Sequence, residues 1–230
     1  MSRILVVGAG GVGASMASIA ESRTFFEVFV LADINEQRCV DALKNLDNPD
    51  RFLTAKVDAN NKDDLVALAR AHKIDIIVNA CDPRLNDPIF AAALEAGCTY
   101  VDMAMNLSKP HPTNPYNEVG EPLGAAQLAA DAQWRDRGLL ALVGMGVEPG
   151  LSNVFARYAA DHLFDTIDEI GVRDGSNLSI DGFDFAPTFS IWTTIEECLN
   201  PPIVWEKSRG LFTTEIFSEP EVFHFPAGIG

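Results

Sequence analysis

The glycine pattern near the amino terminus constrains the fold more than any other feature of the chain. A short apolar run at residues 4–7 leads directly into a G-x-G-x-x-G sequence, which opens a segment of helical apolar period. This spacing between a strand and a helix is typical of the turn that binds a dinucleotide diphosphate, because only glycines permit the tight turn and close backbone approach. The sequence therefore predicts cofactor-binding positions at Gly8, Gly10, Gly11, Val12 and Gly13.

The first 143 residues alternate short β-branched runs with longer segments of helical period. This alternation is typical of βαβ units, whose strands form a parallel sheet covered by helices on both faces. We expect strands at residues 4–7, 28–32, 52–57, 75–80, 99–102 and 139–143. A helix is expected over residues 86–96, with Asn86 as N-cap and Gly97 as its stop. The fold class is therefore α/β, a Rossmann-type doubly wound parallel sheet.

The pattern changes in the second half of the chain. Residues 106–120 hold three prolines and are expected to form a long loop, which is either a functional lid, binding loop or oligomer arm, or a passive surface excursion. After Gly150 we expect a helix from Ser152 to His162 and strands at 167–173 and near 183–189. These features indicate a dinucleotide-binding Rossmann domain at residues 1–148. They also indicate a partial α+β substrate-binding and dimerisation domain at residues 149–230.

Asp33 supplies the second part of the dinucleotide-binding pattern. It lies 20 residues after Gly13 and ends an apolar run. A carboxylate at this point binds the two ribose hydroxyls of NAD and repels the additional phosphate of NADP. The sequence therefore predicts NAD or NADP as cofactor and favours NAD. Arg38 is either a ligand for a 2′-phosphate or, as we favour here, a solvated charge on a helix.

Residues that follow two further strands are expected to lie at the same edge of the sheet, where ligands bind in this architecture. Asp58 is either a contact for the adenine or a helix cap. Cys81 has no neighbouring His or Lys in sequence that would activate its thiol, which disfavours a nucleophilic role. The cofactor contacts predicted at these two strand ends are Asp58, Ala59, Asn79, Ala80, Cys81 and Pro83.

Composition excludes several classes of protein. The chain has 17 Lys and Arg against 33 Asp and Glu, a formal net charge of −16, so attraction to nucleic acid or anionic lipid is disfavoured. No apolar run reaches the roughly 18 residues of a membrane span. The four cysteines are widely spaced and no metal-ligand spacing occurs. We therefore expect reduced cysteines, a cytoplasmic location, no metal, and no nucleic-acid or membrane partner.

Taken together, five segments resemble the saccharopine dehydrogenase family, and the resemblance extends over essentially the whole chain. The segments are residues 6–13, 78–83, 96–102, 144–153 and 186–193. The resemblance implies an NAD(P)-dependent oxidoreductase that acts on CH–NH donors, with hydride transfer between nicotinamide and the C–N bond of an amine or amino acid and its imine. It also implies a homodimer paired through the second domain. Similar proteins continue well beyond Gly230, so we expect this chain to lack the C-terminal part.

Two carboxylates are candidates for the proton handling that such a reaction needs. Asp102 ends the fifth expected strand and is either a substrate-orienting or proton-relay residue, or an anchor for the proline-rich loop. Glu148 is either an ammonium-binding residue or a carboxylate that fixes its own loop. In the proline-rich loop, His111 is the histidine with a functional case. From the second domain, the expected substrate contacts are Ser190, Trp192 and Thr193.

Charge bears on the choice of substrate. The overall negative field favours an amine or amino acid that carries net positive charge. Two other functions stay open at this point. In the first alternative, the chain is a nicotinamide-nucleotide-binding module or truncated subunit without turnover of its own. In the second, it is a structural α/β protein whose glycine turn holds no ligand.

Overall fold

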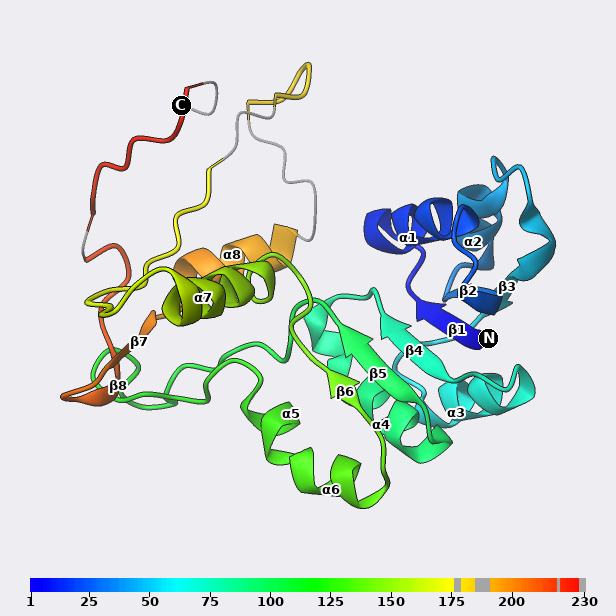
Figure 1. Ribbon diagram of the computed structural model, residues 1–230, viewed down its shortest axis with the longest axis horizontal. Coiled ribbons are helices and arrows are strands. Elements are labelled where there is room, and N and C mark those ends of the chain that lie inside the picture. The colour runs from blue at the N-terminus through cyan, green and yellow to red at the C-terminus, as the bar shows by residue number, and fades with distance from the viewer. Residues whose placement is uncertain (176–178, 185–190, 219, 228–230) are drawn as a thin grey trace. The chain divides into compact units, whose positions relative to one another are not determined.

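A sheet of six parallel strands organises the first part of the chain (Figure 1). The computed structural model describes residues 1–175, 179–184, 191–218 and 220–227, and the strands pair in the order β3-β2-β1-β4-β5-β6. Their bounds are Ser2–Val7 (β1), Phe26–Asp33 (β2), Phe52–Lys56 (β3), Ile76–Asn79 (β4), Thr99–Asp102 (β5) and Ala141–Leu142 (β6). The strand order reverses between β1 and β4, which confirms the predicted doubly wound Rossmann-type fold.

The strands match the predicted positions to within three residues at each end. The largest differences are two residues: β1 and β2 each begin two residues earlier than expected, whereas β6, expected over residues 139–143, is shorter and spans only Ala141–Leu142. It lies at the edge of the sheet and pairs with β5 alone. Because an edge strand gains ladder hydrogen bonds on one side only, its regular part is shorter than its apolar run.

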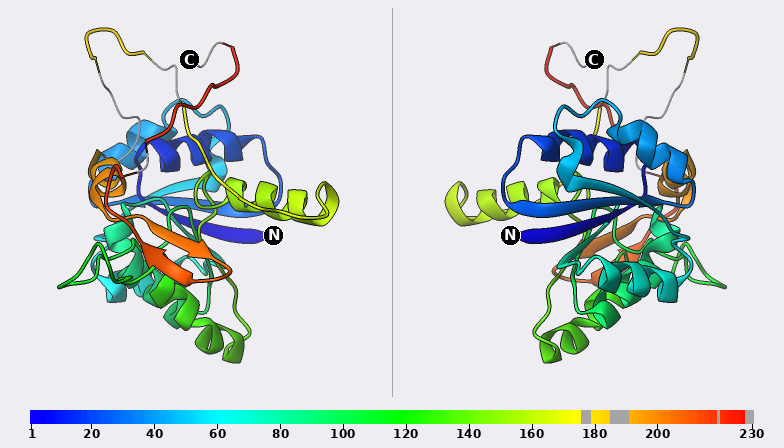
Figure 2. Two further views of the ribbon diagram at one scale, coloured as in Figure 1. Left: turned by 90° about the vertical axis from the view of Figure 1, so that its left-hand side faces the viewer. Right: turned by 90° about the vertical axis from the view of Figure 1, so that its right-hand side faces the viewer.

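Helices cover both faces of this sheet (Figure 2). The helices α1 and α2 pack on one face, and α3 and α4 pack on the other. Short helices α5 and α6 lie between β5 and β6 in the chain. The bounds are Gly11–Glu21 (α1), Glu36–Leu43 (α2), Lys62–Ala71 (α3), Asn86–Ala96 (α4), Ala125–Ala129 (α5) and Asp131–Asp136 (α6), with 3-10 turns η1 at Pro49–Arg51 and η2 at Pro83–Leu85.

The bounds of α4 match the prediction, but the role given to Asn86 was wrong. Leu85 is the N-cap, and Asn86 is the first residue of the helix. Its side chain is buried and accepts a hydrogen bond from Asn79, so it is not available to the helix amides. Gly97 ends the helix with φ +80°, the left-handed conformation that glycine adopts without strain, as predicted.

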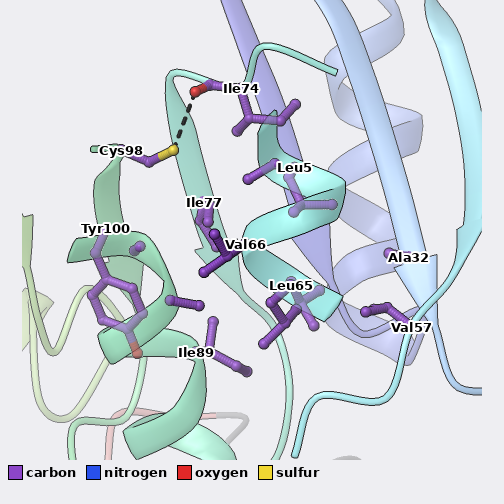
Figure 3. Close-up of a cluster of buried hydrophobic side chains, with 14 of the residues drawn as sticks. Leu5, Ala32, Val57, Leu65, Val66, Ile74, Ile77, Ile89, Cys98 and Tyr100 are labelled. Atoms are coloured by element: carbon purple, nitrogen blue, oxygen red, sulfur yellow. Dashed lines mark hydrogen bonds between the residues drawn. The ribbon is translucent and has the colours of Figure 1, made fainter. Parts of the chain in front are cut away.

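Two apolar clusters hold the helices on the sheet. Because consecutive strand residues point to opposite faces, Leu5 joins the cluster under α3 and α4, while Val6 joins the one under α1 and α2. Figure 3 shows the first cluster, in which Leu65 of α3 and Ile89 of α4 meet the strands. These side chains are fully buried, and their removal from water is the main stabilising contribution to this part of the fold.

The chain divides into two compact units. The first is Met1–Leu107 with Leu123–Leu151, and the second is Ser108–Pro122 with Ser152–Gly230. The elements of the second half are α7 (Leu151–His162), α8 (Ile191–Leu199) and an antiparallel hairpin of β7 (Ile203–Glu206) and β8 (Gly210–Thr213). Helix α7 confirms the helix predicted here and begins at Leu151, one residue before the expected start at Ser152.

The strand expected over residues 167–173 is absent from the described chain, where this segment is irregular. Its three β-branched residues, Ile167, Ile170 and Val172, suit a strand, but among the described residues no strand pairs with the segment, and unpaired backbone does not form a ladder. Near residues 183–189 the structure shows an isolated bridge between Ile180 and Phe183. Residues 185–190, including Ser190, lie outside the described chain.

In the described residues, none of the helices has the length and apolar character needed to cross a bilayer.

Candidate functional site

The glycine turn separates into glycines that build it and glycines that leave it open. Gly8 has φ +106°, and a Cβ there would lie 2.7 Å from the Ala80 carbonyl oxygen. At Gly13 a Cβ would overlap the Gly8 carbonyl oxygen, so this position needs glycine for close packing of α1 on the turn. By contrast, a Cβ on Gly11 would meet nothing within 4 Å. The outer side of the turn is therefore free for a ligand.

Helix α1 begins at this open side. The first hydrogen bond of the helix runs from the Ala14 N–H to the Gly10 carbonyl. The amides of Gly11, Val12 and Gly13 precede it and have no partner within the helix, and the positive end of the helix dipole points the same way. Residues Gly11 and Val12 are exposed. This arrangement is an anion site of the kind that binds a diphosphate.

Asp33 is joined to the turn by hydrogen bonds. Its Oδ2 accepts a hydrogen bond from the Ala9 N–H at 2.8 Å, and its Oδ1 accepts one from the Asn35 N–H at 2.9 Å. The side chain is 8% exposed, and Arg38 Nη1 lies 3.8 Å from Oδ2. The carboxylate therefore fixes the turn after β1 to the end of β2.

A cavity of about 330 Å³ opens beside these residues, at the carboxyl ends of β1, β2, β3 and β4. Its volume suits part of a dinucleotide, and its position is where ligands bind in doubly wound sheets. Seven of the predicted cofactor positions line it: Gly8, Gly10, Asp33, Asp58, Ala59, Ala80 and Cys81. The remaining lining residues are Val7, Ile34, Arg38, Val57, Asn60, Asp82 and Leu85.

Asp58 lines the cavity without capping a helix. Its Oδ1 accepts hydrogen bonds from the backbone N–H and the side-chain amide of Asn60. The N-cap of α3 is Asn61, whose side chain accepts from Asp63 and Asp64. The structure therefore places Asp58 in a turn at the cavity rim, where it is exposed.

Of the predicted residues after β4, Ala80 and Cys81 reach the cavity, whereas Asn79 and Pro83 are buried and lie outside its lining. The Asn79 side chain donates to Asn86 and to the Tyr100 hydroxyl, and accepts from the Cys81 N–H. Pro83 begins η2. Asn79 and Pro83 therefore support the end of β4 from the protein interior and do not line the cavity.

Cys81 is a thiol at neutral pH. Its Sγ lies 3.3 Å from the Val7 carbonyl oxygen, to which it donates. Burial, with the nearby charge of Asp33, raises the pKa of Cys81 to about 12. The geometry therefore gives no support to a nucleophilic role, since the reactive form of cysteine is the thiolate. Within the described residues all four cysteines are free.

Asp102 is buried at the end of β5 and is 1% exposed. Its Oδ1 accepts from the Met105 N–H at 3.1 Å and the Gly144 N–H at 2.8 Å, and its Oδ2 accepts from Gln127 Nε2 at 2.7 Å. The carboxylate thus ties together the segments that follow β5 and β6. All three donors lie outside residues 106–120, so the carboxylate anchors segments on either side of the proline-rich loop.

The other predicted catalytic and substrate residues lie in several places. Glu148 is exposed in the segment before α7, where a cis peptide bond joins it to Pro149. Trp192 is 59% exposed on α8, and Thr193 belongs to the same helix. In the proline-rich loop, His111 Nδ1 accepts from the Asn114 N–H, and its Nε2 lies 3.4 Å from Glu118. In the described chain, no group of acidic, Cys or His residues has metal-binding geometry.

Sequence reasoning missed several residues that shape the site. Ile34 follows the predicted strand at residues 28–32 by two positions, so strand-end position was a usable signal. Gln127, which orients Asp102, lies 25 residues away in α5, and Met105 adopts φ +61° beside it. Nothing in the local sequence marks either role, because both depend on contacts between distant segments.

The family comparison decides the affiliation of the chain. A sequence model described as the saccharopine dehydrogenase NADP binding domain matches residues 4–142, which include the whole cavity lining and all of the sheet except the first two residues of β1. The chain belongs to the saccharopine dehydrogenase family. The resemblance predicted from the five segments is confirmed.

Relatives with curated names agree with this family. The chain is 32% identical over 197 residues to a carboxyaminopropylagmatine dehydrogenase from Synechocystis, covering 86% of this chain and 47% of that protein. It is 32% identical over 217 residues to a carboxynorspermidine synthase from Vibrio cholerae, covering 88% and 50%. This saccharopine dehydrogenase family chain thus spans about half the length of the curated relatives it matches.

A solved structure gives the same fold. The saccharopine dehydrogenase (L-Glu forming) from Saccharomyces cerevisiae superposes with a TM-score of 0.54 at 12% identity, over 71% of this chain and 31% of that one. At this identity the likeness establishes the fold of the saccharopine dehydrogenase family chain and nothing finer.

Proposed function

We propose that this chain is the nucleotide-binding part of an NAD(P)-dependent oxidoreductase that transfers hydride between nicotinamide and the C–N bond of an amine or amino acid and its imine. The observation that carries the proposal is the cavity behind the glycine turn, in a chain of the saccharopine dehydrogenase family. Two curated relatives are named carboxyaminopropylagmatine dehydrogenase and carboxynorspermidine synthase, which supports the choice of a C–N bond.

The residues of the turn fit a dinucleotide. The free amides at the start of α1 bind the diphosphate, and the missing side chains of Gly10 and Gly11 let it approach the backbone. Asp58, Ala59 and Ile34 form the rim against which the adenine packs. When bound, the nicotinamide supplies or accepts the hydride.

The substrate residues remain proposals. Glu148 is exposed in the segment before α7, and we propose that it binds the ammonium group of the substrate. Trp192 and Thr193 of α8 are proposed as substrate contacts, and Ser190, the third residue expected from sequence, lies outside the described residues. Asp102 is reassigned as a positioning residue, because its buried carboxylate already accepts three hydrogen bonds. The net charge of −16 favours a substrate with net positive charge.

Assembly and location complete the proposal. We expect a homodimer that pairs through the second unit, as the family resemblance implies. The widely spaced, free cysteines of the described chain support a cytoplasmic location.

The experiment is a coupled measurement of binding and turnover. The purified chain is titrated with NADH and NADPH by calorimetry, and then assayed for cofactor oxidation with mixtures of an aldehyde or keto acid and a diamine. Turnover that depends on both components, and that falls at least tenfold in Glu148→Gln with cofactor affinity unchanged, supports the enzyme and the role of Glu148.

The second candidate is a cofactor-binding module without turnover of its own. It is favoured by one observation, that the chain spans about half the length of its curated relatives. Micromolar binding of either dinucleotide with no oxidation in any substrate mixture would support the module over the enzyme. Failure to bind either dinucleotide would contradict both.

A further inference from the structure

The positively charged guanidinium of Arg38 lies beside Asp33 in the cavity lining. Among the residues that line the cavity, Arg38 is the one Lys or Arg. Its Nη1 lies 3.8 Å from Asp33 Oδ2, and its Nη2 lies 3.7 Å from the point where a Cβ on Gly10 would stand. The guanidinium therefore lies over the glycine turn, next to the carboxylate that the dinucleotide pattern assigns to the adenosine ribose.

Asp33 is not the free carboxylate that the preference for NAD assumed. Each of its oxygens already accepts a backbone N–H, from Ala9 and from Asn35. Little of the side chain is exposed, and the neighbouring guanidinium offsets its charge. The repulsion that excludes a 2′-phosphate in NAD-selective sites is therefore weakened here.

The other carboxylates near the cavity have partners of their own. Asp82 accepts two hydrogen bonds from the Arg84 guanidinium, at 2.8 and 3.0 Å. Asp58 accepts from Asn60. Glu36, two residues before Arg38, accepts from the Thr54 hydroxyl at 3.2 Å. The Arg38 side chain is 54% exposed, so its donors face solvent as well as Asp33.

From this arrangement we propose that Arg38 binds the 2′-phosphate of NADP(H), and that Asp33 orders the glycine turn without selecting the ribose. A planar guanidinium with several donors is suited to a phosphate dianion, and its position beside Asp33 is next to the ribose hydroxyls. The inference rests on the proposed function, since it assumes that the cavity holds the adenosine end of a nicotinamide dinucleotide.

The test compares the two cofactors in matched variants of the full chain. Calorimetric titration with NADPH and NADH is carried out on the wild type, Arg38→Gln, Arg38→Lys and the control Arg135→Gln. Arg135 lies on α6, is exposed and pairs with Asp131, so it reports the loss of a surface guanidinium alone. Losing charge-assisted hydrogen bonds to one phosphate should weaken NADPH binding about 10- to 100-fold in Arg38→Gln.

In the same variant we expect NADH affinity to change less than about threefold, and Arg38→Lys to recover part of the NADPH affinity. The control should leave both affinities unchanged. An equal loss for both cofactors would assign Arg38 to the shared diphosphate, and no loss would remove it from the site; either result overturns the inference while the proposed function stands. A wild type that binds neither dinucleotide overturns the proposed function and the inference with it.

Asp33→Asn provides an independent check. If Asp33 orders the turn, this variant weakens NADH and NADPH by similar factors, because the Ala9 amide loses its anionic acceptor. A rise of tenfold or more in the preference for NADPH would show that Asp33 selects the ribose, and would overturn that half of the inference.

Discussion

Replacing Gly13 by alanine tests the packing of the glycine turn, with Gly11→Ala as its matched control. A Cβ at position 13 would overlap the Gly8 carbonyl oxygen and lie 3.1 Å from the Gly8 carbonyl carbon. Both atoms belong to the backbone, so no side-chain rotation relieves the overlap, and α1 must shift away from the turn. At position 11 the same methyl group meets nothing within 4 Å.

The expected loss of unfolding free energy follows from the different surroundings of a Cβ at positions 13 and 11. Overpacking that flexible side chains absorb costs about 1–3 kcal/mol, and an overlap with rigid backbone belongs at or above the upper end of that range. A loss of about 3 kcal/mol in the free energy of unfolding changes the folding equilibrium by roughly 150-fold. For Gly11→Ala we expect a change within about 0.5 kcal/mol, as for other exposed positions.

Urea unfolding followed by circular dichroism measures both values, and titration with NADPH measures the ligand site. We expect Gly13→Ala to lose both stability and cofactor binding, and Gly11→Ala to keep its stability. Equal stability of the two variants would refute the reasoning, because it would mean that α1 does not pack on the turn as described.

Three further predictions test other parts of the structure. Asp102→Asn should lower the free energy of unfolding by about 2–4 kcal/mol, measured by urea titration, because buried charge-assisted hydrogen bonds are lost; an unchanged value would contradict its anchoring role. Iodoacetamide at neutral pH should label the exposed Cys198 well before Cys81, whose pKa is raised to about 12, as peptide mass spectrometry would detect. Burial raises the pKa of Cys39 from 9.0 to about 11, so the unfolded state loses its proton first and stability should fall between pH 9 and 11. Thermal unfolding across that range should show a shallower fall in Cys39→Ala, and an identical slope would contradict the assignment.

The sequence predicted the sheet well because its signals are local. Each strand is a short apolar run, and Gly13 and Gly97 mark a close helix contact and a helix end by their own conformational properties. A parallel sheet buries both faces, so strand composition alone identified it. The segment at 167–173 has three β-branched residues among charged ones and no paired strand in the described chain, so the strand expected there was wrong.

The site was predicted less completely, because its roles depend on which partner each polar group finds. Asp33 was correctly placed at the end of β2, but its bonds to Ala9 and Asn35 are invisible in the sequence. Asp102 looked equally suited to catalysis and to anchoring until Gln127 and Gly144 supplied its partners. The position of a residue along a strand can be read from the local sequence. The hydrogen-bond partners of its side chain depend on the tertiary structure.

The central claim is that the free amides at the start of α1 bind the diphosphate of a nicotinamide dinucleotide. A crystal structure of this chain grown with NADPH tests it most directly. We expect diphosphate oxygens within hydrogen-bond distance of the Gly11 and Val12 amides, with the adenosine in the cavity beside Asp33. A turn left empty while the nucleotide binds elsewhere would contradict it.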